Sequence, residues 1–106
     1  MQSYADFVPI FKALADEKRL KIIDMLSCGE MCACKILEKF NFSQPALSQH
    51  MKVLCRSGLV AGVRDGAWMH YTLNKEKYMQ IIQFITFISN NKADNIESEC
   101  ASGVCN

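Results

Sequence analysis

The sequence predicts a mainly α-helical fold that carries a small β-hairpin. Apolar residues recur at helical spacing in five segments, and two runs rich in β-forming residues flank Asp65-Gly66, a frequent hairpin turn. A length of 106 residues suits one domain, and a domain of this size gains stability from burial against a partner subunit. We expect that domain at residues 1–90, followed by a flexible, cysteine-containing tail at residues 91–106.

Two amphipathic helices are expected before residue 30. Apolar side chains recur at helical spacing from Tyr4 to Ala15 in the first, and from Leu20 to Leu26 in the second. A turn at residues 15–16 separates the two helices, and Ser27-Cys28-Gly29 ends the second one.

Two shorter helices follow, joined by residues 41–43. The third helix is expected at about residues 31–40. Ser43 is expected to cap the fourth helix, because its hydroxyl can accept an otherwise unpaired N–H. Pro45 suits the first turn, where its missing donor costs nothing, and Gly58 ends the helix.

A hairpin and a fifth helix complete the predicted elements. The strands are expected at Leu59–Arg64 and Trp68–Leu73, and the helix at Lys75–Ser89. This last helix has apolar side chains around most of its circumference, so it must be covered on more than one side. In so small a domain, we expect the second cover to come from another copy of the chain.

The third and fourth helices match a helix-turn-helix, whose second helix enters the major groove of DNA. A hairpin directly after it makes the predicted fold a winged helix-turn-helix, whose wing touches the neighbouring groove or phosphates. Leu47, Met51 and Leu54 form the expected buried stripe of the fourth helix. The candidate DNA-contacting residues are Ser43, Gln44, Ser48, Gln49, His50, Lys52, Arg56 and, at the wing tip, Arg64.

The chemistry of these residues divides them into two roles. Gln can bond an adenine edge with two hydrogen bonds and Ser suits a base or a phosphate, whereas Lys52 and Arg56 suit phosphates. His50 lies toward the buried side by helical phase, so we expect packing or a phosphate contact. The alternative is an ordinary solvated helix face, and the hairpin that follows favours DNA. Residues 1–93 carry a net charge of +4, which suits a polyanion without requiring one.

Composition argues against export and membrane insertion. The chain has six cysteines but no stretch with the features of an export signal, so we expect thiols in the cytoplasm. The most apolar run, Tyr78–Ile88, is interrupted by polar residues and is too short to span a bilayer. No membrane partner is expected.

Four segments between residues 7 and 73 carry a more specific signal: LKII, CACKIL, SQPALSQHMKVLCRSGLV and RDGAWMHYTL. Their order and spacing resemble the ArsR/SmtB family of metal-sensing bacterial repressors, and within it the arsenic-responsive branch. The resemblance implies a homodimer, paired through its first and last helices, that occupies double-stranded operator DNA until an inducer releases it. The inducer implied is As(III) or Sb(III), no organic cofactor is implied, and the regulated genes would confer arsenic resistance.

The family places its inducer thiols in a Cys-x-Cys at the start of the first helix of the helix-turn-helix, where this chain has Cys32 and Cys34. On an ideal helix, residues two apart point about 200° apart. We therefore expect the two cysteines to flank the buried stripe on opposite sides of the helix. Binding one atom would then require the first turn to unwind, which would misplace the neighbouring recognition helix.

A third thiolate is expected for a trivalent arsenic centre, and its identity stays open. The family's third thiol lies three residues after the pair, where this chain has Leu37. The candidates are Cys28 in the preceding turn and Cys100 or Cys105 in the tail. Cys55 is a further candidate, although it more simply packs as a small, half-buried side chain.

Two other functions remain open. The same scaffold could sense cadmium, lead or zinc, or thiol oxidation, through Cys32, Cys34 and the tail thiols. A small thiol enzyme or metal carrier is the third reading, but no Cys-x-x-Cys lies beside a βαβ pattern and no nucleophile pairs with a base. We therefore expect no enzyme, and we interpret His70 in the second strand as structural.

Overall fold

The computed structural model describes residues 3–41 and 43–90, which form two compact units. The first unit ends at Lys75, and the second begins at Glu76. The predicted tail, with Cys100 and Cys105, lies outside the described residues. A single domain over residues 1–90 stays a prediction.

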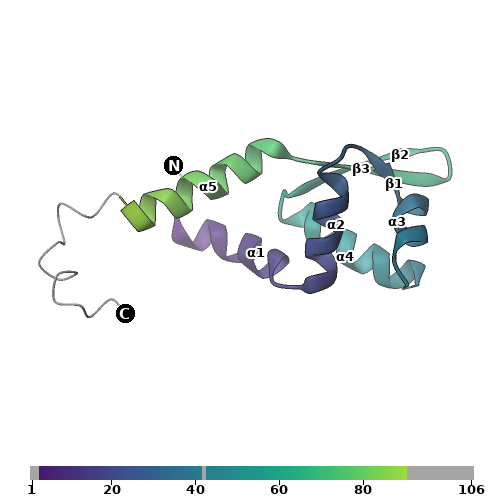
Figure 1. The fold of residues 1–106 in the computed structure, drawn as a ribbon, viewed down its shortest axis with the longest axis horizontal. Helices are drawn as coiled ribbons and strands as arrows, with labels where there is room; N and C mark the ends of the chain where they lie inside the picture. The colour runs from purple at the N-terminus through teal and green to yellow at the C-terminus, as the bar shows by residue number, and fades with distance from the viewer. Residues whose placement is uncertain (1–2, 42, 91–106) are drawn as a thin grey trace, which may run out of the picture. The chain divides into compact units, whose positions relative to one another are not determined.

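The described chain is mainly helical and contains a three-stranded antiparallel sheet (Figure 1). Its elements follow in the order α1 (Tyr4–Leu14), α2 (Glu17–Leu26), β1 (Met31–Cys32), α3 (Ala33–Lys39), α4 (Gln44–Arg56), β2 (Val60–Asp65), β3 (Trp68–Leu73) and α5 (Lys75–Asn90). The α3–α4 pair followed by the β2–β3 hairpin confirms the predicted winged helix-turn-helix. Pairing of two copies stays a prediction.

Capping residues explain where α2 and α4 begin. Asp16 Oδ1 accepts hydrogen bonds from the backbone N–H groups of Lys18 and Arg19, at 2.9 and 3.1 Å. Ser43 Oγ accepts one from the N–H of Ala46 at 3.2 Å, which confirms the predicted cap of α4. The α4 helix ends shortly before Gly58, whose φ of 85° suits glycine.

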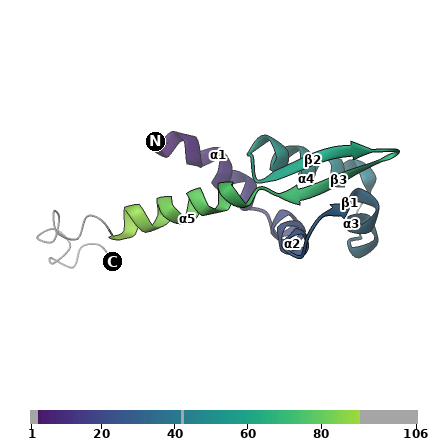
Figure 2. The ribbon, with the colours of Figure 1, turned by 90° about the horizontal axis from the view of Figure 1, so that it is seen from above.

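The sheet has the strand order β1-β3-β2, and Figure 2 shows α3 beside β1. The β2–β3 hairpin confirms the sequence prediction, with a turn whose Gly66 has a φ of 70°. Strand β1 was not predicted. It corrects the expected helix at residues 31–40, because the residues expected to form its first turn are extended and pair with β3.

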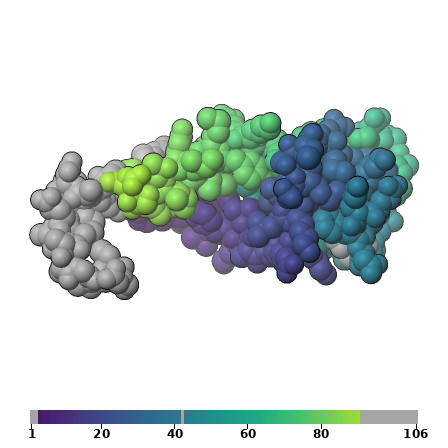
Figure 3. Space-filling view, viewed as in Figure 1, coloured from purple at the N-terminus to yellow at the C-terminus, as the bar shows by residue number. Residues whose placement is uncertain are grey.

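The core of the first unit lies among α1, α2, α3, α4 and the hairpin. Helix α2 packs on α4 (Figure 1), and α4 packs on β2. In the space-filling view, α2 and α3 lie on the near face of this unit (Figure 3). The largest fully buried side chains are Ile22, Ile36, Met51, Leu54 and Leu59.

Helix α5 keeps a wide apolar surface, as its pattern predicts. It ends at Asn90, one residue later than expected. No described helix is both long enough and apolar enough to cross a membrane. The large apolar side chains that are exposed on α5 are Met79, Ile82, Ile85, Phe87 and Ile88.

Replacing Asp16 with Ala should lower the free energy of unfolding by about 1 kcal/mol, because two N–H groups of α2 lose their acceptor. Asp16→Asn is the matched control, because its side-chain oxygen still accepts and should keep most of this stability. Urea unfolding followed by circular dichroism near neutral pH measures both variants. An Asp16→Ala protein as stable as the unchanged chain would contradict the cap.

The same cap makes the stability pH-dependent. The hydrogen bond from the Arg19 N–H is the largest cause that lowers the pKa of Asp16 below its ordinary value of 3.8. A carboxylate with a depressed pKa stabilises the fold above its unfolded-state pKa and loses that effect as the pH falls through the folded-state pKa. The difference between the unchanged chain and Asp16→Ala should therefore shrink in acid.

Candidate DNA-binding and thiol sites

Helix α4 has one buried and one exposed face. Leu47, Met51 and Leu54 are at most 2 % exposed and form the predicted buried stripe. The predicted DNA-contacting side chains that are exposed at the N-terminus and on the opposite face are Ser43, Gln44, Ser48, Gln49, Lys52 and Arg56. This face therefore offers amide and hydroxyl groups first and cations further along, as base reading followed by phosphate binding requires.

His50 is the half-buried member of the predicted set. Its Nδ1 lies 3.3 Å from Nη1 of Arg19. Arg19 Nε also donates to the carbonyl oxygen of Ala13 at 2.7 Å, and Nη2 donates to that of Lys12 at 3.3 Å. One guanidinium thus joins the end of α1 and the start of α2 to α4. The sequence gives no sign of this role, because an arginine on an amphipathic helix usually faces solvent.

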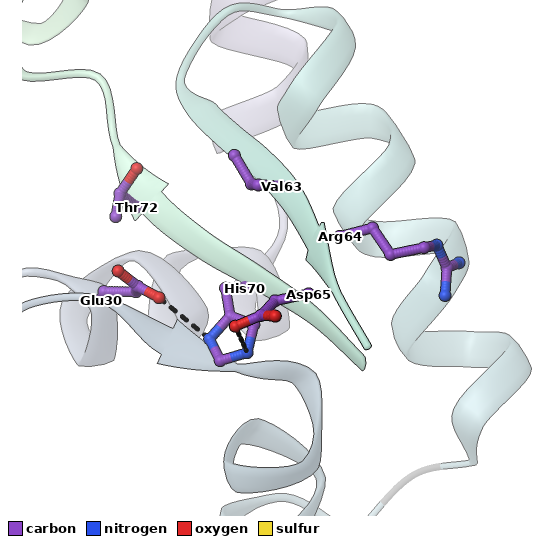
Figure 4. Close-up of a pocket in the computed structure, with 6 residues that line it drawn as sticks. All are labelled: Glu30, Val63, Arg64, Asp65, His70 and Thr72. Carbon is purple, nitrogen blue, oxygen red and sulfur yellow. Dashed lines mark ion pairs between the residues drawn. The ribbon is translucent and has the colours of Figure 1, made fainter. Parts of the chain in front are cut away.

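Arg64 lies near the tip of the wing, which consists of β2, β3 and the turn between them. It is exposed, and strand alternation puts it on the opposite sheet face from Val63 and Asp65. Figure 4 shows its side chain pointing away from His70. Gly62, on the same face as Arg64, pairs with the buried Tyr71, so Arg64 belongs to the sheet face that contacts the core.

Cys32 and Cys34, the dithiol pair, lie where β1 passes into α3. Cys32 ends β1 and is the N-cap of α3, with an extended backbone at φ −82° and ψ 157°. Cys34 lies in the first turn of α3. The two Sγ atoms are joined in a disulfide, and the Cα atoms are 5.4 Å apart.

The predicted placement of the dithiol pair on opposite sides of a helix is therefore wrong. Cys32 is not helical, and its extended backbone lets its side chain meet that of Cys34. Sharing one atom does not require α3 to unwind. Once reduced, the pair offers two sulfurs that the backbone already brings to one place, and both residues are half-buried.

The third thiol stays open among the described residues. Cys28 is a free, exposed thiol in the turn before β1. Burial raises the pKa of the Cys55 thiol, which disfavours the thiolate that a soft ion needs and fits the predicted packing role. Leu37 is half-buried. Within residues 3–41 and 43–90, no group of three or more His, Cys, Asp or Glu side chains is arranged to hold a metal ion.

His70 lies on the other face of the sheet from Arg64 and Tyr71, between two carboxylates (Figure 4). Its Nδ1 is 2.9 Å from Glu30 Oε2, and its Nε2 is 4.0 Å from Asp65 Oδ2. These three residues help to line an open depression of about 420 Å³. The contacts fit the structural role predicted for His70, whereas Glu30 was not singled out, because nothing local marks it.

Comparison with known sequences places these features in a family. A model described as bacterial regulatory protein, arsR family, matches residues 16–61. The arsenical resistance operon repressor of Staphylococcus aureus is 44% identical over 97% of this chain and 99% of its own length. The repressor of the same name from Staphylococcus xylosus is 43% identical over the same shares.

Solved structures agree with this assignment. An ArsR-like transcriptional regulator from Rhodococcus sp. RHA1 has a TM-score of 0.79 over 90% of both chains, at 23% identity, which supports the fold alone. The transcriptional regulator HlyU from Vibrio vulnificus CMCP6 is 36% identical, with a TM-score of 0.62 over 79% of this chain and 88% of its own. The relatives are transcriptional regulators, which confirms that the chain is not an enzyme. The chain therefore belongs to the ArsR family of bacterial, DNA-binding regulatory proteins.

Proposed function

We propose that this protein is a repressor of arsenic-resistance genes, and that As(III) or Sb(III) bound by Cys32 and Cys34 releases it from operator DNA. The observation that carries the proposal is the β1–α3 junction, where two sulfurs meet beside the helix-turn-helix. Two relatives at 43% and 44% identity over nearly the full length, both named arsenical resistance operon repressors, support the inducer.

The chemistry of the pair suits a thiophilic ion. Thiolates are soft ligands, and the N-terminal end of a helix favours negative charge, so the start of α3 is a suitable place for them. One of Cys28, Cys100 and Cys105 supplies a third sulfur that strengthens binding. The response itself needs only the dithiol pair.

Inducer binding reaches both elements that face DNA. Helix α3 directly precedes α4, whose exposed Gln and Ser side chains read bases. Strand β1 pairs with β3, which belongs to the wing. An inducer that binds better to the conformation with low DNA affinity shifts the population toward that conformation. Release from the operator follows from this difference in affinity.

The repressor acts in the cytoplasm as a homodimer on an inverted repeat. Exposed Tyr4 and Val8 on α1, and the exposed apolar side chains of α5, supply surface for the second copy to bury. The two recognition helices then lie about one turn of DNA apart, roughly 34–36 Å.

Sensing of thiol oxidants is the second candidate function, and the Cys32–Cys34 disulfide favours it. A peroxide would oxidise the two thiols to the disulfide and be reduced to water, and the oxidised pair could not bind arsenite. Cadmium, lead and zinc are further inducers that a thiol site accepts.

Cys32→Ser and Cys34→Ser should each keep operator binding but abolish release by arsenite, because the site loses one of its two essential sulfurs. Fluorescence anisotropy of labelled operator DNA measures both properties, and the unchanged protein should lose about fivefold or more in operator affinity. Cys55→Ser is the matched control and should respond normally. Cys28→Ser should still be released by arsenite, and it should need a higher arsenite concentration only if Cys28 is the third ligand. Normal release of either Cys32→Ser or Cys34→Ser would sink the proposal.

Gln49→Ala should relax sequence preference, whereas Lys52→Ala should weaken binding to all DNA and lower the slope of log affinity against log salt by about one. The reason is that an amide reads base edges and an ammonium neutralises a phosphate. Lys21→Ala removes the same charge from α2 and serves as control. Binding to operator and scrambled DNA at several salt concentrations measures these effects, and equal loss of specificity in Gln49→Ala and Lys52→Ala would refute the division of roles.

Mild peroxide treatment should join Cys32 to Cys34 within one molecule, because their sulfurs already meet. Mass spectrometry of the tryptic peptide of residues 22–35 should then show the loss of two hydrogen atoms. Cys28→Ser should retain this loss and Cys32→Ser should not. Operator binding by the oxidised protein separates the two functions: release by peroxide alone favours oxidant sensing, and release by arsenite alone favours the arsenic proposal.

A further inference from the structure

The outer face of the sheet joins the dithiol pair to the wing. Residues paired across antiparallel strands place their side chains on the same face. Cys32 pairs with His70, and His70 pairs with Val63, so these three residues share a face. Asp65 and Thr72 follow at two-residue steps and lie on it as well. The side chain of Cys32 is therefore on the same sheet face as these wing residues.

His70 connects the two ends of this surface. Its Nδ1 atom lies 2.9 Å from the carboxylate of Glu30. Glu30 directly precedes β1 and stands two positions before Cys32. The Nε2 atom faces Asp65, the last residue of β2, at 4.0 Å. Figure 4 shows the two carboxylates approaching the ring from these two segments. Both contacts are ion-pair distances, and the first, at 2.9 Å, is also within hydrogen-bond range.

The short pairing of β1 with β3 gains stability from the contact between Glu30 and His70. Strand β1 has two residues and pairs with β3 at two positions, Met31 with Tyr71 and Cys32 with His70, and this is below the usual length of a strand. Cross-strand side-chain contacts contribute much of the stability of a sheet. The Glu30–His70 contact ties Glu30, the residue before β1, to β3, where the backbone ladder is shortest.

A metal ion does not explain the arrangement of Glu30, Asp65 and His70. The carboxylates face opposite nitrogens of the ring, so the three side chains do not converge on one point. The described part of the chain contains no group of three such side chains that could hold a metal ion. Glu30, His70 and Asp65 instead link the three neighbouring strands of the sheet, β1, β3 and β2.

We propose that His70 is a positioning residue that couples the dithiol pair to the wing, an inference that rests on the proposed function. Drawing Cys32 and Cys34 onto one arsenic atom moves β1 against β3. The Glu30–His70 contact carries that movement to β3 of the wing. Without this contact, the dithiol pair still binds arsenite, but loading changes operator affinity less.

The test compares variants that remove the hydrogen bond from either side. His70→Thr keeps a residue that favours strands but removes the ring, and Glu30→Ala removes the acceptor. Glu30→Gln restores an acceptor oxygen and should rescue the coupling. Thr72→Val, on the same strand and face, is the matched control. Circular dichroism establishes that each full-length variant is folded.

The measured quantity is the ratio of operator affinity without arsenite to operator affinity with saturating arsenite. In the unchanged protein we expect this ratio to lie in the usual coupling range of roughly 5- to 150-fold. It should fall at least about threefold in His70→Thr and in Glu30→Ala. The double variant should show no further fall, because both changes remove the same contact. Arsenite affinity measured without DNA should stay within about twofold in all variants, because the sulfurs are intact. A purely structural role would change stability or operator affinity without changing the ratio.

Two results would overturn the inference, and they are distinguishable. If the unchanged protein has a ratio near one, the proposed function fails and the role of His70 fails with it. If the unchanged protein has a large ratio and His70→Thr and Glu30→Ala keep it, arsenite sensing stands and the role of His70 alone is refuted. If the hydrogen-bond variants lose coupling while Glu30→Gln and Thr72→Val retain it, the inference is supported.

Discussion

Pairing of the two-residue strand β1 with β3 is the constraint on which the candidate thiol site depends. It keeps Cys32 extended, so that α3 begins at the next residue, Ala33, and Cys34 falls in its first turn. Two cysteines on one continuous helix would point about 200° apart. The sheet therefore converts a Cys-x-Cys, which as a helical motif could not share a ligand, into a pair of sulfurs that meet.

The same constraint ties the proposed inducer site to the elements proposed to contact DNA. On one side, α3 leads into α4, which Arg19 and His50 hold against the junction of α1 and α2. On the other side, β1 is the third strand of the wing's own sheet. A small movement at the dithiol pair is therefore felt by two packed elements, and packed elements tend to switch between discrete arrangements rather than deform continuously.

Much of the fold was predictable because local chemistry determines it. Helical periodicity located five helices, Ser43 and Pro45 marked the start of α4, and Asp65-Gly66 marked the hairpin. The exposed face of α4 follows from the same periodicity, so the sequence alone is enough to name the candidate DNA-binding side chains.

What could not be predicted depends on contacts between distant segments. Strand β1 is too short to show a period of two and exists because β3 lies beside it, about forty residues away in the chain. The same holds for Arg19 with His50 and for Glu30 with His70, whose partners are set by packing. The error about the dithiol pair had this origin, since an isolated segment of this composition is expected to be helical.

The most direct test of the account is reciprocity between arsenite and operator DNA. If arsenite weakens operator binding by a given factor, operator DNA must weaken arsenite binding by the same factor, because both are one coupling free energy. Arsenite should be titrated into the reduced protein with and without saturating operator, and the ratio of its two affinities compared with the ratio of operator affinities. The account predicts two equal ratios, each well above one. Arsenite affinity that is the same with and without operator would contradict it.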